Sequence, residues 1–276
     1  MRVLITGGAT GLGQAIAFKW ASKCASKEDG IDICIADINQ ERGNETVNAL
    51  TAKGANAFYA HCDITSDGDV QRLTQTIESR WDSIDYVFNN AGVATGGSLL
   101  DETIEQWQWV FDINVLGMVR VSRALLPLMR KQGSGYFINI ASQAGLTPIP
   151  YMGSYNSVKA AVVSFSETMK LELAPDNINV SVVCPSFFKT NLDESMRSNN
   201  PASHKMINKF FARADMTKEE VAESIYQQVS KGKFLILTHK LGKRAFLLKK
   251  LLPTQRYISN MLNQTKTMKR AMEKQT

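Results

Sequence analysis

Tyr155 and Lys159 lie four residues apart in "SYNSVKAA" (154–161), a segment whose small and apolar residues suit a helix. Residues i and i+4 share one face of a helix, so this spacing places a phenol beside an ammonium group. Many solvated helices carry such a pair without any chemical role. The chemical alternative is that the cation favours the phenolate and lowers the pKa of Tyr155, which would let this side chain give and take a proton near neutral pH.

A glycine-rich turn, "TGGATGLG" (6–13), follows the strand-like segment "RVLIT" (2–6) and opens a helix. Its glycines allow a tight turn and let backbone N–H groups approach a phosphate at the helix N-terminus. Asp37 ends the next strand-like segment, where a carboxylate can bind a ribose 2′-OH and repel a 2′-phosphate. The alternative for Asp37 is to cap the helix that begins near Asn39. The pattern predicts a dinucleotide site that prefers NAD to NADP, with Arg42 as the nearest basic residue.

Short β-branched segments alternate with longer amphipathic segments along the chain. The expected strands are 2–6, 31–37, 56–62, 84–90, 135–141, 178–184 and 233–238, and the expected helices are 12–27, 40–53, 67–82, 104–132 and 155–174. Strands joined by crossover helices form a parallel sheet with helices on both faces. The predicted fold class is therefore α/β, a Rossmann-like doubly wound sheet of about seven strands, followed by a basic helical C-terminal tail.

Two segments depart from this alternation. Residues 186–216 mix aromatic and polar residues after a strand, at the sheet edge where ligands bind, and we interpret them as a substrate lid within a catalytic domain of residues 1–238. A disordered loop is the alternative. Residues 239–276 carry ten Lys/Arg and one acid, which leaves 22 basic and 25 acidic residues for the rest of the chain. The net positive charge therefore belongs to this C-terminal extension.

Over about residues 2 to 238 the sequence resembles the short-chain dehydrogenase/reductase family. "TGGATGLG" is similar to the family's T-G-x-x-x-G-x-G turn, "NNAG" (89–92) to its N-N-A-G, and "YNSVK" (155–159) to its Y-x-x-x-K. Asn114, in "DINVLG", stands at the place of the family's helix asparagine, and Ser142 ends the fifth expected strand 13 residues before Tyr155. "PSFFKT" (185–190) departs from P-G-x-x-x-T, because Ser186 replaces the glycine.

The resemblance implies an NAD(P)-dependent oxidoreductase that transfers a hydride between nicotinamide and a secondary alcohol or ketone. Tyr155 would exchange the proton on the substrate oxygen, and Lys159 would lower the pKa of Tyr155 and bind the nicotinamide ribose. Ser142 would hold the substrate oxygen, and Asn114 would position a water that connects Lys159 to solvent. The implied cofactor-binding residues are Gly7, Thr10, Gly11, Leu12 and Gly13 at the pyrophosphate, Asp37, Asp63 and Asn90 at the adenosine end, Tyr155 and Lys159, and Phe188 and Thr190 at the carboxamide. For Asp63, capping a helix is an equal alternative.

Other chemistry finds little support in the sequence. "IASQAG" around Ser142 is not the G-x-S-x-G of a hydrolase, and the scattered cysteines and histidines have no metal-ligand spacing, so no metal site is expected. A cofactor-sensing regulator without turnover, or a 3-oxoacyl reductase acting on a carrier-bound substrate, remains an alternative function. Apolar residues in the lid and in "GLTPIPYMG" favour a lipophilic substrate, although they could simply pack the lid down; they are Phe187, Phe188, Met196, Met206, Phe210, Phe211 and residues 145–153.

The partners expected from the sequence concern two surfaces. The resemblance implies a homodimer or homotetramer formed through 104–132 and 155–174. In "LGKRAFLLKKLL" (241–252), Leu241, Ala245, Leu248 and Leu252 share one face of a basic amphipathic helix. This helix could attach to an anionic membrane, dock an acidic carrier, or pack on the body; nucleic acid is not expected, because aromatic residues that stack on bases are scarce. Without a membrane-spanning segment or secretion signal, we expect a cytoplasmic protein.

Overall fold

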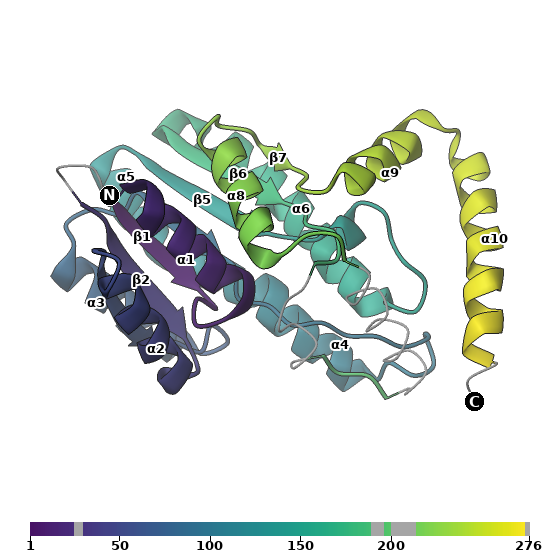
Figure 1. The fold of residues 1–276 in the computed structure, drawn as a ribbon, viewed down its shortest axis with the longest axis horizontal. Coiled ribbons are helices and arrows are strands. Elements are labelled where there is room, and N and C mark those ends of the chain that lie inside the picture. Colours follow the sequence, from purple (N-terminus) through teal and green to yellow (C-terminus); the bar gives the residue numbers. More distant parts are fainter. Residues whose placement is uncertain (25–29, 189–195, 200–213, 274–276) are drawn as a thin grey trace.

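The computed structural model describes residues 1–24, 30–188, 196–199 and 214–273. Its centre is a parallel sheet of seven strands in the order β3-β2-β1-β4-β5-β6-β7 (Figure 1). The strands are β1 (Arg2–Thr6), β2 (Asp32–Asp37), β3 (Asn56–His61), β4 (Tyr86–Asn89), β5 (Gly135–Ile140), β6 (Ile178–Val183) and β7 (Leu235–Ile236). The predicted doubly wound α/β fold is confirmed. The last strand is shorter than predicted, with only two residues in the ladder beside β6.

The described helices agree with the amphipathic segments of the sequence and add one that was not predicted. They are α1 (Gly11–Cys24), α2 (Gln40–Thr51), α3 (Asp67–Arg80), α4 (Ile104–Phe111), the π-helical turn η1 (Asp112–Gly117), α5 (Met118–Gln132), the short 3-10 turns η2 (Gln143–Gly145) and η3 (Ala174–Asp176), α6 (Gly153–Leu173), α8 (Lys218–Val229), α9 (Lys240–Leu251) and α10 (Thr254–Glu273). The unpredicted helix is α8. It begins at a reciprocal capping box, in which the Thr217 hydroxyl accepts from the Glu220 N–H and the Glu220 carboxylate accepts from the Thr217 N–H.

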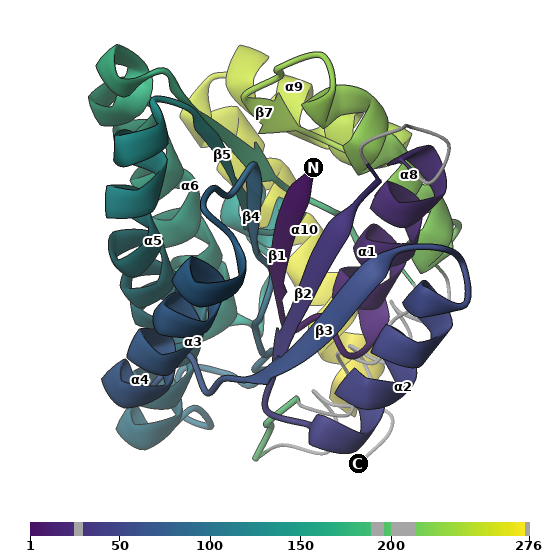
Figure 2. The same cartoon turned by 90° about the vertical axis from the view of Figure 1, so that its left-hand side faces the viewer.

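Helices cover both faces of the sheet, with α1, α2 and α8 on one side and α3, α5 and α6 on the other (Figure 2). Side chains alternate along each strand, so a single strand contributes to two separate cores. Val3 and Ile5 of β1 pack in the cluster with α1 and α8, whereas Leu4 packs in the cluster with α3 and α5. All three are fully buried. This double burial explains why the strands of the sequence are nearly continuous apolar segments.

The strand order places β1 between β2 and β4, so the chain reverses its direction of winding at this point. In an open parallel sheet the crevice outside the carboxyl ends at such a reversal binds ligands. The segments that leave β1, β4, β5 and β6 all reach this edge, and they carry "TGGATGLG", "NNAG", Ser142 and "PSFF". The fold therefore gathers motifs that are far apart in the sequence.

The C-terminal helices extend away from this body. In Figure 1, α9 follows β7 and leads outwards, and α10 then runs at a steep angle to α9 along the side of the molecule. Among the residues that the structure describes, no helix is both long enough and apolar enough to cross a membrane.

Candidate active site

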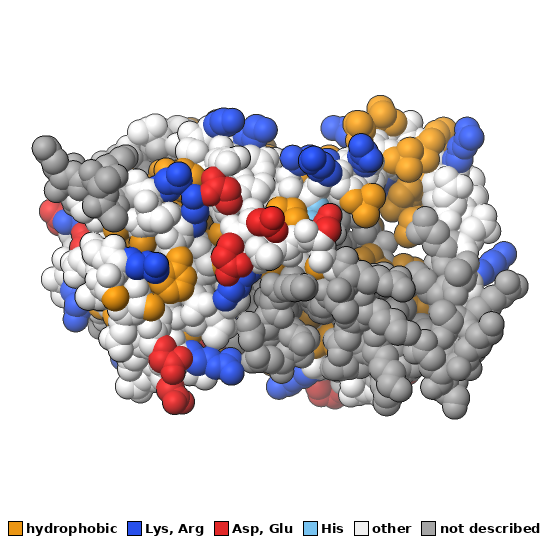
Figure 3. Space-filling view, viewed as in Figure 1, with side chains coloured by type: hydrophobic (Ala, Val, Ile, Leu, Met, Phe, Trp, Pro, Cys, Tyr) orange, Lys and Arg blue, Asp and Glu red, His pale blue; other side chains and the backbone are white. Residues whose placement is uncertain are grey.

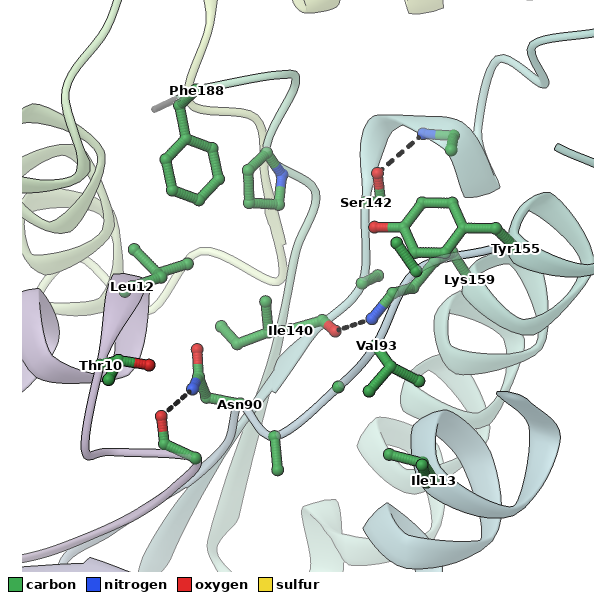
Figure 4. Close-up of a pocket in the computed structure, with 18 of the residues that line it drawn as sticks. Thr10, Leu12, Asn90, Val93, Ile113, Ile140, Ser142, Tyr155, Lys159 and Phe188 are labelled. Atoms are coloured by element: carbon green, nitrogen blue, oxygen red, sulfur yellow. Dashed lines mark hydrogen bonds between the residues drawn. The ribbon is translucent and has the colours of Figure 1, made fainter. Parts of the chain in front are cut away.

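A cavity of about 510 Å³ opens at the carboxyl edge of the sheet. Every segment gathered at this edge contributes to its wall, from the glycine-rich turn to the start of the lid (Figure 4). The sequence-predicted residues on its wall are Gly7, Thr10, Gly11, Leu12, Asp37, Asp63, Asn90, Ser142, Tyr155, Lys159 and Phe188. Thr190 lies outside the described residues, as do Met206, Phe210 and Phe211.

Ser142, Tyr155 and Lys159 come together in one corner of the cavity, which we call the catalytic corner (Figure 4). Tyr155 and Lys159 project from the first turns of α6, and the Tyr155 hydroxyl points towards the Ser142 hydroxyl (Figure 4). The Lys159 Nζ lies 5.7 Å from the centroid of the Tyr155 ring and donates a hydrogen bond of 3.1 Å to the Ile140 carbonyl oxygen. The Ser142 Oγ accepts from the Ala144 N–H at 3.1 Å, which fixes the hydroxyl at the start of η2.

Burial controls the protonation of this corner. It raises the pKa of Tyr155 to about 12, and the Ser142 hydroxyl offsets only part of that increase. Burial also lowers the pKa of Lys159 to about 8, against a smaller opposing effect of the Cys184 thiol. The prediction that Tyr155 has a lowered pKa is therefore wrong for the protein alone, because burial outweighs the effects that favour the phenolate. In a buried site desolvation disfavours both charged forms, so Tyr155 is a protonated phenol at neutral pH.

Asn114 approaches the corner from the π-helical turn η1, a widened geometry that is frequent at functional sites. Its Nδ2 donates to the carbonyl oxygens of Val110 and Val93 at 3.0 and 3.1 Å. Its Oδ1 is buried and, within the described parts of the chain, accepts no hydrogen bond. A Cβ atom on Gly92 would lie 2.7 Å from this Oδ1 and 3.4 Å from the Lys159 Nζ. Glycine at position 92 thus keeps open a small polar space that both atoms border.

Glu102 is a positioning residue that the sequence reasoning missed. Its buried carboxylate accepts the Ser154 N–H at 3.0 Å and the Ser154 hydroxyl at 2.7 Å. The Ser154 hydroxyl also contacts the Thr95 hydroxyl at 2.6 Å. An anion at the N-terminus of a helix satisfies free N–H groups and interacts well with the helix dipole. Glu102 thereby fixes the start of α6 one residue before Tyr155, although no local sequence pattern connects two residues 52 positions apart.

The glycine-rich turn has the conformation expected of a phosphate-binding turn. Gly7 and Gly11 have positive φ angles of 60° and 56°, and Gly11 begins α1. Gly13 packs inside the turn, because a Cβ there would lie 2.3 Å from the Gly7 carbonyl oxygen. Asn90 supports the same turn, since its Nδ2 donates to the carbonyl oxygens of Thr6 and Gly7 at 2.9 and 3.0 Å. Gly13 and Asn90 therefore shape this wall in addition to any contact with a ligand.

Asp37 joins the glycine-rich turn to the end of β2. One carboxylate oxygen accepts the Ala9 N–H and the other accepts the Asn39 N–H, both at 3.0 Å. The N-cap of α2 is Asn39 itself, whose side chain accepts from the Arg42 N–H. Asp37 stands on the cavity wall beside Ile38 and Arg42. The capping alternative for Asp37 is thus wrong in detail, because a different residue caps the helix.

Asp63, like Asp37, both bonds the backbone of its own turn and lines the cavity. Its Oδ1 accepts from the N–H and the hydroxyl of Thr65 at 2.9 and 2.7 Å, which closes the turn before α3. The N-cap of α3 is Ser66. Asp63 also lines the cavity, so the turn and a ligand contact are compatible.

The end of the cavity around Tyr155 is apolar. Tyr155 packs with Ala94, Ala144, Met152 and Met196, and Ile149 and Phe187 pack against this cluster. The described part of the predicted lid reaches this end, since the Arg197 N–H donates to the Ala94 carbonyl oxygen at 3.1 Å. Its next neighbours, 189–195 and 200–213, lie outside the described residues.

The backbone at position 186 accommodates a serine where the resembled motif has glycine. It is not among the residues with positive φ in the described chain, so a side chain causes no strain there. Its N–H donates to the His239 Nδ1 at 3.2 Å, and the Thr238 hydroxyl contacts the same nitrogen at 2.7 Å. Burial lowers the pKa of His239, which keeps the ring neutral and able to accept. His239 thus supports the backbone at this departure, a contact that the sequence did not reveal.

The residues present fit a dinucleotide. The two glycines with positive φ leave the N-terminus of α1 open to the cavity, where N–H groups can bind a pyrophosphate. The Asp37 carboxylate lies on the same cavity wall, where it could accept hydrogen bonds from ribose hydroxyls, and the apolar corner with Ser142 and Tyr155 leaves room for a substrate.

Comparison with known proteins agrees with this geometry. The family model described as short chain dehydrogenase matches residues 1–201. The chain is similar to cyclopentanol dehydrogenase from Comamonas sp., with 31% identity over 70% of this chain and 75% of that protein. It is also similar to a 3-oxoacyl-[acyl-carrier-protein] reductase from Synechocystis sp., with 31% identity over 71% of this chain and 77% of that protein. A crystal structure of a short chain dehydrogenase/reductase from Burkholderia phymatum in complex with NAD superposes with a TM-score of 0.83, at 29% identity over 90% of this chain and 92% of the other.

Proposed function

Because the chain belongs to the short-chain dehydrogenase family, it is an oxidoreductase that acts on a CH–OH group with NAD or NADP, and we propose that Ser142, Tyr155, Lys159 and Asn114 carry out the proton chemistry. The observation that carries this proposal is the catalytic corner, in which a phenol, a hydroxyl and an ammonium meet at the apolar end of the cavity. The nicotinamide, when bound, supplies or takes the hydride.

Tyr155 gives its proton to the oxygen of a ketone, or takes one from an alcohol. The raised pKa keeps the phenol protonated at neutral pH, which suits donation to a ketone. Ser142 holds the same substrate oxygen, because its hydroxyl can donate while it accepts from the Ala144 N–H. Lys159 binds the nicotinamide ribose. A water between the Asn114 Oδ1 and the Lys159 Nζ, in the space that Gly92 leaves open, returns protons from solvent.

The cofactor is held by the glycine-rich turn, and Asp37 makes NAD the preferred form. Thr10, Leu12, Asp63 and Asn90 complete the adenosine and pyrophosphate walls, and Phe188 and Thr190 are assigned to binding the carboxamide. Asp37 disfavours a 2′-phosphate by charge repulsion. Replacing Asp37 by Ala together with Ile38 by Arg should move the preference towards NADP, measured as the ratio of kcat/KM for the two cofactors. If the unaltered protein already prefers NADP, Arg42 on the same wall becomes the residue that selects the cofactor.

The substrate is a lipophilic secondary alcohol or ketone. Support comes from the methionines 152 and 196 beside Tyr155, with Ile149 and Phe187 around them. A carrier-bound 3-oxoacyl group is the second candidate, favoured by the similarity to the Synechocystis reductase and by the basic C-terminal helices. A regulator that binds the cofactor without turnover would have no chemical use for the catalytic corner.

Two proposals concern organisation. The catalytic domain is residues 1–238 with the lid at 186–216, and residues 239–276 are an extension. The protein forms a homodimer or homotetramer through the helices between 104 and 132 and through α6. Ile104, Leu116 and Leu171 on these helices are 69%, 48% and 76% exposed, which supports an apolar interface there. Sedimentation of the purified protein as a monomer at micromolar concentration would refute this interface.

The experiment that tests the function follows NADH absorbance while purified protein meets cyclic and long-chain secondary alcohols with NAD, and the matching ketones with NADH. We expect turnover of at least one apolar pair and weaker turnover of small polar alcohols. Tight NADH binding without turnover of any compound, including acyl-carrier substrates, would favour the regulator. Turnover restricted to carrier-bound 3-oxoacyl groups would favour the second candidate.

A further inference from the structure

A band of exposed apolar side chains follows the two C-terminal helices. Figure 3 shows hydrophobic side chains, among basic ones, over α9 and the beginning of α10. We call this band and its charges the tail surface. Its apolar members, with their exposed fractions, are Leu241 (73%), Leu247 (55%), Leu248 (53%), Leu251 (71%), Ile258 (44%) and Leu262 (56%). Its exposed basic members are Lys240, Lys243, Arg244, Lys250, Arg256 and Lys266.

The apolar residues of the tail surface are exposed even though α9 contacts the body. The helix packs through another side, where Gly242 is buried so closely against Gln143 that a Cβ would lie 2.6 Å from the Gln143 Oε1. The Lys249 Nζ, on the same side, donates to the Leu146 carbonyl oxygen. The predicted apolar face is therefore split, since Ala245 is half-buried whereas Leu241 and Leu248 point outwards. The alternative that this helix only packs on the body does not explain why Leu241 and Leu248 are exposed.

The charge of the tail surface has one sign. Between Glu223 and Glu273 the sequence has no acidic residue. In the part of the chain that the structure describes, no carboxylate forms an ion pair with Lys240, Lys243 or Lys250. A second copy docked through this surface would place like charges against each other. The partner must therefore be negative and also accept aliphatic side chains over the length of two helices.

We propose that the tail surface attaches the protein reversibly to the surface of an anionic lipid bilayer. The leucines enter the boundary between headgroups and acyl chains, and the lysines and arginines remain at the level of the lipid phosphates. Such attachment needs no membrane-crossing helix. Exposed leucines between basic residues on consecutive helices suit this layered partner better than the compact, acidic face of a carrier protein.

The test uses the full-length protein and sedimentation with vesicles of phosphatidylcholine alone or mixed with phosphatidylserine. We expect binding only to the mixed vesicles, with release by high salt because the charges are screened. Lys243→Gln with Lys250→Gln should weaken partitioning about thirtyfold, since each basic residue near an anionic surface contributes a factor of about five. Leu241→Asn with Leu248→Asn should also reduce binding. Matched controls are Lys53→Gln with Lys131→Gln, and Leu100→Asn, which alter exposed residues elsewhere and should bind normally.

Circular dichroism melting of each variant shows that loss of binding is not loss of folding. Absence of binding to the mixed vesicles by the unaltered protein overturns the proposal, as does equal binding by the Lys243 and Lys250 variant. A change of oligomer mass in the Leu241 and Leu248 variant, without lipid, would assign the surface to a second copy instead. Comigration with an acidic acyl carrier protein, without vesicle binding, would assign it to a carrier.

Discussion

The catalytic corner and the tail surface reverse the usual distribution of side chains in opposite ways. In the corner, Tyr155 and Lys159 are buried, with only 8% and 5% of their surface exposed. In the tail surface, Leu241 and Leu251 are more than two-thirds exposed, at 73% and 71%. Burying ionisable groups lowers the free energy of unfolding, and an exposed leucine does not contribute the stabilisation that it would give if buried. Neither arrangement benefits the folded chain by itself, so each indicates a partner: a substrate and cofactor in one case, and a surface in the other.

The largest contrast in stability should be between leucines. Leu125 of α5 is 1% exposed within the core, so Leu125→Ala should lower the free energy of unfolding by about 2 to 5 kcal/mol. Leu248→Ser, at a site that is 53% exposed, should change it by less than about 0.5 kcal/mol. Urea unfolding of both variants checks this. A large loss for Leu248→Ser would mean that the tail surface is part of the core and not an attachment site.

A smaller effect should appear in the pH dependence of stability at the corner. Burial lowers the pKa of Lys159 to about 8 from its ordinary value of 10.5, so between these values the unfolded chain binds a proton that the folded chain lacks. The free energy of unfolding of the cofactor-free protein should therefore rise by about 2 kcal/mol from pH 8 to about pH 10 through this group. The raised pKa values of the buried Cys34, Cys62 and Cys184 from about pH 9, and that of Tyr155 above about pH 10, act in the opposite direction, so the contribution of Lys159 is measured as a difference between variants.

Lys159→Met should lack this rise, whereas Lys131→Met, at an exposed site, should retain it. Urea unfolding at the two pH values measures the difference. The same slope in the Lys159 variant would show that the ammonium is not desolvated, and it would remove the physical distinction between the corner and the surface.

The smallest effect concerns how the helices of the two regions begin. On the body, α8 starts with the Thr217 and Glu220 capping box, whereas the N-cap of α9, His239, makes no side-chain capping hydrogen bond. Thr217→Ala should reduce stability by about 1 kcal/mol. Thermal melting measures this loss of stability, and Thr254→Ala at the first residue of α10 is the comparison. If both variants lost equal stability, α10 would depend on its first residue as much as α8 depends on its N-cap.

The order of elements could be predicted because each is encoded by neighbouring residues. Alternating segments specify the parallel sheet, and "TGGATGLG" and "YNSVK" specify their own local geometry. Those motifs place Gly7, Gly11, Tyr155 and Lys159 on the cavity wall without any knowledge of distant contacts. The helix α8 was also predictable in principle, because "TKEE" (217–220) has the spacing of a capping box.

Features that depend on distant residues could not be predicted. The link from Glu102 to Ser154 and the support of Ser186 by His239 join residues 52 and 53 positions apart. The pKa of Tyr155 was predicted in the wrong direction because the i,i+4 spacing shows the ammonium but not the burial that outweighs it. Which side of α9 faces outwards was left open by the sequence for the same reason, since contacts with the distant Gln143 and Leu146 decide which side is covered.

The measurement that tests the central claim most directly is the turnover of Tyr155→Phe with the best substrate of the unaltered protein. Only the transferable proton is lost, so kcat should fall by about 10²-fold or more, while NADH binding, followed by fluorescence titration, should remain nearly unchanged. Tyr136→Phe is the matched control, because Tyr136 is a buried tyrosine outside the cavity whose hydroxyl bonds Ser181. Near-normal turnover by Tyr155→Phe would contradict the assignment of the catalytic corner.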